Sequence, residues 1–372
     1  MNSNMNKMGR RFIISGGGTG GHIFPALSIA DAIKEREPDA EILFIGANGR
    51  MEMERVPAAG YKIEGLDVSG FDRSNLFRNI SVLFKLGKAL LKARKIIHKF
   101  NPDAVIGVGG YVSGPTLKVA QSLSIPTIIQ EQNSYAGVTN KLLAKSANLI
   151  CVAYDNMERF FPKERIRLLG NPIREGLLSN NISKEEAYKT LGLNPNCKTL
   201  LVIGGSLGAR SINDGISILA KDIAGDSSIQ VLWQTGKRYY EELSASISKD
   251  NATNIHIRPF IDRMDMAYKV ADLVVSRAGA SSISELAVLG KASILIPSPN
   301  VSEDHQTKNA MAMVEKGAAI MLKDSESTTR LSSTVLATIN DQNTLDRLSK
   351  KIESLAERNS AKRIVEEIYR VI

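Results

Sequence analysis

Two stretches of this chain, 10–35 and 198–223, repeat one layout, and this repeat constrains the fold more than any other feature. Each begins with an apolar run, continues through a glycine-rich turn and ends in a helix-like segment: RRFIISGGGTGGHIFPALSIADAIKE in the first, KTLLVIGGSLGARSINDGISILAKDI in the second. A strand, a tight turn and a helix in succession are typical of α/β proteins with parallel sheets. The sequence therefore predicts two units of this kind in tandem.

Further apolar runs alternate with helix-like segments in both halves of the chain. Strands are expected at RFIIS, EILFIGA, DAVIGVG, PTIIQEQ and NLICVA in the first half, and at QVLWQTG, NIHIRPFI, DLVVSRAG and ASILIPSP in the second. Residues 347–372 read as one or two terminal helices. The simplest account is two Rossmann-like units, 1–170 and 171–354, with a linker near 170–172.

Composition excludes several classes of protein. A chain of 372 residues with 43% hydrophobic and 23% charged residues suits two soluble domains. Two cysteines, Cys151 and Cys197, and four histidines give no spacing typical of a disulfide scaffold or a metal centre. No apolar run approaches the roughly 18–20 residues that span a bilayer, and the polar N-terminus lacks a signal-peptide pattern. We expect a cytoplasmic location.

The positive charge is unevenly distributed along the chain. The net charge is +9, and residues 1–171 hold 23 Lys and Arg against 15 Asp and Glu, which is +8 of that total. A basic excess confined to one half favours a polyanionic partner for that half, either nucleic acid or an anionic membrane. A solvated basic surface is the alternative.

The first glycine turn satisfies the spacing G-x-G-x-x-G through Gly16, Gly18 and Gly21. In nicotinamide-binding proteins, an acidic residue about 20 positions further on ends the second strand and holds the ribose. Here that strand ends in FIGANG, without a carboxylate, and no Walker pattern is present. Four glycine turns follow predicted strands, at 16–21, 107–115, 204–210 and 277–285. Backbone N–H groups at such turns and at helix N-termini favour a diphosphate ligand.

A sugar nucleotide fits this arrangement. Metal-dependent sugar transferases usually carry an Asp-x-Asp motif, and none is convincingly placed here. We therefore expect no metal and no other cofactor. Helix N-termini, backbone N–H groups and Arg174 or Arg210 would then neutralise the charge of the leaving group.

Several longer motifs resemble the MurG family of bacterial UDP-N-acetylglucosamine transferases. GGTGGHIFPAL, GVGGYVSGP, QEQNSYAGVTNKLLA, GNPIR, GGSLGAR, FIDRM, RAGASSISEL and HQTKNA follow in that family's order and spacing. The resemblance implies a GT-B fold, in which two Rossmann-like domains face each other across a cleft and the C-terminal helix, about 355–372, packs back onto the first domain. It also implies the inverting transfer of GlcNAc from UDP-GlcNAc to the 4-hydroxyl of undecaprenyl-linked lipid I, which gives lipid II for peptidoglycan synthesis.

The same resemblance assigns site residues. Ile261 should contact uracil, Glu285 the ribose hydroxyls, and Gln306 and Asn133 the GlcNAc. Arg174 and Ser206 should be donor contacts. The remaining implied donor contacts are Thr19, Gly20, Gly21, Ala280, Ser281, Ser282, Ile283 and Ser284. Gly18, Gly110 and Tyr111 are expected to contact the acceptor.

His22 is the residue we expect to be catalytic. An acceptor hydroxyl that attacks an anomeric carbon must lose its proton, and a neutral imidazole can accept that proton near neutral pH. The alternatives are that His22 orients the substrate or serves only the structure. Glu285 also has a structural alternative, because Ser282-x-x-Glu285 matches a capping box. The family often has HEQN where this chain has QEQN, so Gln130 weakens any mechanism that needs two histidines.

The basic half contains the segment SNLFRNISVLFKLGKALLKARKIIHKF, whose apolar residues alternate with basic ones. Core packing is the default for Leu86, Leu90 and Ile97. A lipid-linked acceptor requires contact with a membrane, so we expect the start of this helix to enter the anionic inner leaflet. The expected membrane patch consists of Phe77, Ile80, Leu83, Phe84, Lys85 and Lys88.

The expected location is thus the cytoplasmic face of the bacterial inner membrane, as a peripheral protein. Other proteins of cell-wall synthesis or division remain open as partners, and no nucleic acid is expected because the basic stretch lacks a base-reading module. Three alternative functions stay open: a transferase with another lipid acceptor, a UDP-GlcNAc 2-epimerase, and a non-catalytic binding protein.

Overall fold

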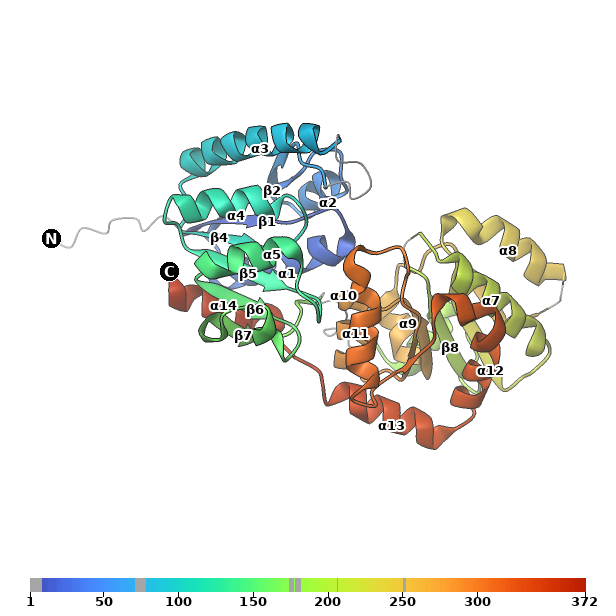
Figure 1. Ribbon diagram of the computed structural model, residues 1–372. Helices are drawn as coiled ribbons and strands as arrows, with labels where there is room; N and C mark the ends of the chain where they lie inside the picture. The colour runs from blue at the N-terminus through green and yellow to red at the C-terminus, as the bar shows by residue number, and fades with distance from the viewer. Residues whose placement is uncertain (1–8, 71–77, 174–176, 178–181, 206, 250–251) are drawn as a thin grey trace. The chain divides into compact units, whose positions relative to one another are not determined.

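The computed structural model describes residues 9–70, 78–173, 177, 182–205, 207–249 and 252–372. The chain forms two compact units, Met1–Arg174 with Glu357–Ile372, and Glu175–Ala356. Each unit is built on its own parallel sheet, which confirms the α/β class with two parallel sheets (Figure 1).

The first unit contains a seven-stranded sheet in the order β3-β2-β1-β4-β5-β6-β7, with every pair parallel. Its strands are β1 Arg11–Ser15, β2 Glu41–Ala47, β3 Lys62–Leu66, β4 Ala104–Gly107, β5 Thr127–Glu131, β6 Leu149–Val152 and β7 Ile166–Leu168. Its α-helices are α1 Gly20–Arg36, α2 Glu52–Ala58, α3 Arg78–Phe100, α4 Ser113–Ser122, α5 Val138–Leu143 and α14 Ser360–Val371.

Alternating side chains of β1 show how both faces of this sheet are covered. Phe12 and Ile14 belong to a core formed with α1 and α14, whereas Ile13 belongs to a core formed with α3 and α4. Buried apolar residues on both faces are typical of parallel strands. The last helix, α14, adds Ile364 and Ile368 to the first of these cores.

The second unit contains a six-stranded parallel sheet in the order β10-β9-β8-β11-β12-β13. Its strands are β8 Lys198–Ile203, β9 Ile229–Gln234, β10 Ile255–Arg258, β11 Leu273–Ser276, β12 Ser293–Leu295 and β13 Ile320–Met321. Its α-helices are α6 Lys184–Leu191, α7 Arg210–Asp222, α8 Lys237–Lys249, α9 Met264–Val270, α10 Ala280–Val288, α11 His305–Val314, α12 Ser327–Ile339 and α13 Gln342–Glu353. Short 3-10 turns complete both units.

The strand order reverses direction once in each sheet. In the first unit the chain moves outward from β1 to β3 and then returns to place β4 on the other side of β1; β8 and β11 are related in the same way in the second unit. Ligands of open α/β sheets bind at the carboxyl ends of the strands that flank such a reversal. The fold therefore marks the loops after β1, β4, β8 and β11.

Candidate active site

In the first unit, the loops after β1 and β4 touch through their backbones. Gly110 has φ of +81°, and a Cβ there would lie 2.4 Å from the Gly17 carbonyl oxygen. Only glycine allows both this conformation and this approach. The two loops therefore form one continuous surface, from which α1 begins.

His22 lies in the first turn of α1, against the loop that follows β4. Its Nδ1 is 3.0 Å from the Gly17 carbonyl oxygen and 3.4 Å from Thr19 Oγ1. A carbonyl oxygen can only accept a hydrogen bond, so Nδ1 carries the proton and the lone pair of the neutral ring is on Nε2. A Cβ at Gly109 would lie 2.8 Å from Nε2, so this glycine makes room for the ring.

Glu52 is a residue of this site that sequence reasoning missed. It is fully buried at the start of α2, and its two carboxylate oxygens accept from the N–H groups of Gly18 and Ala47, each at 3.0 Å. A carboxylate was expected only at the end of β2, at Ala47. Glu52 lies five residues further on, after another turn. The N–H of Gly18 is therefore engaged within the protein, which leaves its carbonyl or Cα for the expected acceptor contact.

The other first-unit residues surround the start of α1. Thr19 is the N-cap with extended backbone, and Gly20 and Gly21 are the first two helical residues. Tyr111 is exposed, and its ring lies against Gly70, where a Cβ would be 2.5 Å from the ring Cζ. The structure thus brings Thr19, His22 and the loop that precedes Tyr111 to one end of the sheet.

Asn133 follows β5 and is oriented by Glu131. Its backbone N–H and its Nδ2 both donate to Glu131 Oε1, at 3.1 and 3.2 Å, while Gly137 N and Asn140 Nδ2 donate to Oε2. Burial raises the pKa of Glu131, against the lowering effect of these four donors. Glu131 was not singled out from the sequence, although it precedes Asn133 by two residues.

Gln130 belongs to a buried amide network. Its Nε2 donates to Asn171 Oδ1 at 3.0 Å, and its Oε1 accepts from Gln132 Nε2. Gln132 Nε2 also donates to the Val108 carbonyl, and Asn171 Nδ2 donates to the Gln132 carbonyl. The amide at position 130 therefore joins the ends of β4 and β5 to the segment that leaves the first unit.

In the second unit, α7 and α10 begin directly after the glycine turns that follow β8 and β11. Neither helix has a capping side-chain hydrogen bond or an acidic residue in its first turn, and α1 of the first unit is the same. By contrast, Ser183 caps α6, which carries Glu185 and Glu186. Uncapped N–H groups and the helix dipole favour an anion at α7 and α10. Ser206 and Arg174 lie outside the described residues.

Helix α10 contains six of the expected donor contacts, Ala280 to Glu285. It begins at Ala280 with Gly279 as N-cap, so Ser282 is already inside the helix and the capping-box alternative for Glu285 is wrong. The carboxylate of Glu285 instead accepts from the Tyr268 hydroxyl at 3.1 Å. The Ser281 hydroxyl makes no hydrogen bond to any described residue, and Ser284 Oγ donates to the Ala280 carbonyl. Ile283 is buried.

Gln234, at the end of β9, is another residue that the sequence did not reveal. Its Oε1 accepts from the Ile261 N–H at 2.9 Å, and its Nε2 donates to the Gly205 carbonyl at 3.0 Å. The amide thereby joins the third glycine turn to the segment expected to contact uracil. The Ile261 N–H is engaged, which leaves the carbonyl and side chain of Ile261 for a base.

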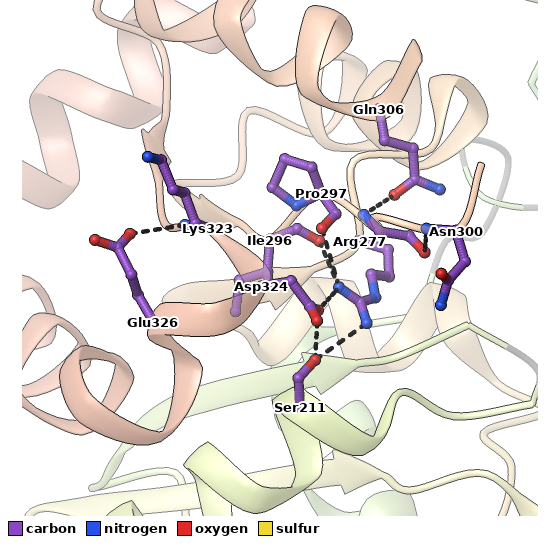
Figure 2. Close-up of polar contacts among 10 residues, drawn as sticks. Ser211, Arg277, Ile296, Pro297, Asn300, Gln306, Lys323, Asp324 and Glu326 are labelled. Atoms are coloured by element: carbon purple, nitrogen blue, oxygen red, sulfur yellow. Dashed lines mark hydrogen bonds and ion pairs between the residues drawn. The ribbon is translucent and has the colours of Figure 1, made fainter. Parts of the chain in front are cut away.

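Figure 2 shows how Arg277 and Gln306 are held beside the end of β12. Arg277 pairs with Asp324, donates to the carbonyls of Ile296 and Pro297 at 3.2 Å, and donates to Ser211 Oγ. These bonds occupy the guanidinium within the protein, where it anchors the turn before α10. The Ser298 N–H donates to Gln306 Oε1 at 2.8 Å, so the amide of Gln306 presents Nε2 as a donor.

The expected membrane patch is only partly within the described residues. Phe77 lies outside them, as does the side chain of Ile80. Leu83 and Phe84 on α3 are 58% and 66% exposed, Lys85 and Lys88 are exposed, and Lys88 Nζ lies 4.5 Å from the Phe84 ring centre. Leu91, which was not singled out, is 72% exposed on the same side of the helix, one heptad after Phe84.

Among the helices of the described residues, none combines the length and the hydropathy that a membrane span requires. No group of three or more His, Cys, Asp or Glu side chains within those residues is placed to hold a metal ion.

The fold and the site define a glycosyltransferase. Residues 12–152 match the glycosyltransferase family 28 N-terminal domain, and residues 199–368 match its C-terminal domain. Structures of the kitacinnamycin glycosyltransferase and of CalG4, the calicheamicin glycosyltransferase, share the fold with TM-scores of 0.72 and 0.71, at 14% and 15% identity. The expected GT-B class is thereby confirmed.

Proteins of similar sequence show which family of glycosyltransferases this is. An enzyme of Parabacteroides distasonis named UDP-N-acetylglucosamine--N-acetylmuramyl-(pentapeptide) pyrophosphoryl-undecaprenol N-acetylglucosamine transferase is 58% identical over 97% of this chain and 98% of its own. The crystal structure of Acinetobacter baumannii MurG is 28% identical, has a TM-score of 0.79 and covers 97% of this chain. This chain belongs to the MurG family of N-acetylglucosamine transferases, as its motifs predicted.

Proposed function

We propose that this protein transfers GlcNAc from UDP-GlcNAc to the 4-hydroxyl of MurNAc-pentapeptide pyrophosphoryl-undecaprenol, lipid I, to form lipid II and UDP. The observation that carries this proposal is the full-length identity of 58% with a transferase of that name. The first unit carries the residues that serve the lipid-linked acceptor, and the second unit carries most of the UDP-GlcNAc contacts.

His22 acts as the base in this proposal. The acceptor O4 attacks C1 of the donor sugar on the face opposite UDP, the O4–C1 bond forms, and the bond from C1 to the UDP oxygen breaks with its electron pair on UDP. The proton of the hydroxyl passes to Nε2, which carries the lone pair because Nδ1 donates to the Gly17 carbonyl. The configuration at C1 is inverted.

The second unit stabilises the departing UDP. Its negative charge lies at the uncapped N-termini of α7 and α10, with the Ser281 hydroxyl as an additional donor. Glu285 accepts from the ribose hydroxyls, and Gln306 donates its Nε2 to a sugar hydroxyl. We propose that these groups replace a metal ion and that no cofactor is needed.

Metal independence gives the first prediction. UDP release from UDP-GlcNAc should require a lipid I analogue and should proceed at the same rate in excess EDTA, because helix N-termini and N–H groups supply the positive field. Release is measured with a coupled UDP assay, with added Mg²⁺ as the matched condition. Loss of turnover in EDTA that Mg²⁺ restores would refute metal independence.

The same assay separates the alternative functions. A structure of the UDP-GlcNAc 2-epimerase of Neisseria meningitidis shares the fold at a TM-score of 0.67 with 14% identity. An epimerase would release the 2-epimer without any acceptor, and a diacylglycerol-specific transferase would turn over with that lipid and not with lipid I. Either result would contradict the proposed function.

We further propose that the protein binds the cytoplasmic face of the inner membrane through α3. The exposed side chains of Leu83, Phe84 and Leu91 form an apolar strip, and exposed lysines flank it. Attraction to anionic headgroups contributes about 1 kcal/mol of binding free energy for each lysine near the membrane surface. Contact with the membrane brings the enzyme to its acceptor, whose lipid chain is embedded in that membrane.

Flotation with liposomes tests the membrane proposal. The unaltered protein should float with anionic and not with neutral vesicles, and binding should decrease at high salt. The double variant Leu83→Glu/Phe84→Glu should bind anionic vesicles at least about tenfold more weakly, since it adds negative charge where apolar groups enter the lipid. Val138→Glu/Leu142→Glu makes the same change on exposed α5 and serves as control. Equal loss in both double variants would place the contact elsewhere.

A further inference from the structure

One peptide group connects the buried carboxylate of Glu52 to the ring of His22. The carbonyl of Gly17 and the N–H of Gly18 belong to the same peptide plane. The N–H end donates to Glu52 Oε2 at 3.0 Å, and the carbonyl end accepts from His22 Nδ1 at 3.0 Å. Carboxylate, peptide and imidazole thus form a single line of hydrogen bonds.

Glu52 is held firmly in this line. Its side chain is fully buried, and its second oxygen accepts from the Ala47 N–H at 3.0 Å. The backbone of Gly17 packs directly on it, because a Cβ at Gly17 would lie 1.9 Å from Oε1. Both oxygens accept hydrogen bonds from N–H groups, which suits the ionised carboxylate.

The direction of the peptide that Glu52 holds is not fixed by its own backbone torsions, although the Gly17 carbonyl also lies against the backbone of Gly110. The peptide lies between two glycines, which have the widest choice of backbone angles, and Gly18 already has φ of +89°. A half-turn of this peptide would direct its N–H, instead of its carbonyl, toward His22. Nδ1 would then have to accept, and the ring proton would move to Nε2.

We propose that Glu52 is a positioning residue for the transfer reaction: through the Gly17–Gly18 peptide it fixes the tautomer and the orientation of His22. This inference rests on the proposed function, in which His22 Nε2 accepts the proton of the acceptor hydroxyl. The negative carboxylate polarises the peptide, makes the Gly17 carbonyl a stronger acceptor and stabilises the imidazolium that forms during transfer. The peptide takes the place that a carboxylate occupies in an Asp–His pair.

Glu52→Gln tests this role with little change in shape. Glutamine has one acceptor oxygen and one NH₂ group, so it cannot accept from both Ala47 and Gly18. We expect kcat to fall about 10- to 100-fold, in the range that misplacement of a reacting group causes, while KM for UDP-GlcNAc is unchanged. The acid limb of the kcat profile should move to lower pH. Glu54→Gln, an exposed change on the same helix, should be silent.

Nuclear magnetic resonance of ¹⁵N- and ¹³C-labelled histidine measures the tautomer directly. The signal of His22 is identified by its loss in His22→Ala. We expect the Nδ1–H tautomer in the unaltered protein and a mixture of tautomers in Glu52→Gln. An Nε2–H tautomer in the unaltered protein overturns the inference, even if Glu52→Gln fails to fold.

The two hypotheses can fail separately. If Glu52→Gln keeps both kcat and the tautomer of the unaltered protein, the positioning role is wrong while the transfer function stands. If His22→Ala keeps normal turnover, the proposed role of His22 is wrong, and the tautomer measurement still decides whether Glu52 orients the ring.

Discussion

His22→Ala should lower kcat by about two to four orders of magnitude, the usual contribution of a general base. The alanine enzyme cannot take the proton of the acceptor hydroxyl, whereas the donor contacts of the second unit are untouched. KM for UDP-GlcNAc should therefore be unchanged. In the unaltered enzyme kcat should decrease in acid as the imidazole becomes protonated, and His22→Ala should lack that limb. Steady-state rates with a lipid I analogue across pH measure both effects.

His98→Ala is the matched control, because His98 is exposed near the end of α3. It should leave the rate and its pH profile unchanged. If His22→Ala kept both the kcat and the acceptor KM of the unaltered enzyme, the base role and the substrate-orienting role would both be wrong. A rise in acceptor KM with unchanged kcat would favour the orienting role.

Glu285→Ala should raise KM for UDP-GlcNAc about 10- to 100-fold, because hydrogen bonds between a carboxylate and the ribose hydroxyls contribute roughly 1.5–3 kcal/mol. The carboxylate is buried at α10 and held by the Tyr268 hydroxyl. Tyr268→Phe keeps the carboxylate of Glu285 but removes the hydrogen bond that orients it. We therefore expect a smaller rise in KM for UDP-GlcNAc. Initial rates over a range of UDP-GlcNAc concentrations provide the values.

Glu241→Ala, which removes an exposed carboxylate from α8, is the control for charge. Thermal unfolding of each variant shows whether α10 remains intact. If Glu285→Ala lowers the melting temperature while KM stays constant, Glu285 serves the structure and the ribose contact is wrong.

The sequence predicts most of the fold because parallel strands are buried on both faces and read as continuous apolar runs. The predictions for β1 and β2 match the observed bounds, and the other strands expected in the two halves are present within a few residues. The strands β3, β7 and β13 were not predicted. All three are edge strands; β7 and β13 have only three and two residues, and β3, KIEGL, alternates charged with apolar residues.

The candidate site was predictable where function depends on residues next to a glycine turn. His22 and the start of α10 follow directly from strand–turn–helix patterns. The groups that hold these residues in place were not predictable, because their hydrogen-bond partners are distant in sequence. Glu52 bonds to Gly18 across 34 positions, and Gln234 bonds to Ile261 across 27. No local pattern marks such pairs. The capping box was misread because α10 begins two residues before Ser282.

The structure also indicates which kind of ligand the G-x-G-x-x-G turn of the first unit suits. The absent carboxylate at the end of β2 argued against a dinucleotide, and the structure places Glu52 under the loop instead. A negative group that takes the Gly18 N–H makes this turn a poorer place for a phosphate than the turns before α7 and α10. The first turn therefore suits a neutral hydroxyl and its base.

The first unit is assembled from both ends of the chain, and this sets an order on folding during synthesis. Its core includes Ile364 and Ile368 of α14, which are translated after the whole of the second unit, whereas the second unit is continuous in sequence. The second unit can thus complete its core before the first, although it is translated later. Until α14 is made, the core that it shares with α1 lacks Ile364 and Ile368, so this face of the first sheet is only partly covered while the second unit is being translated.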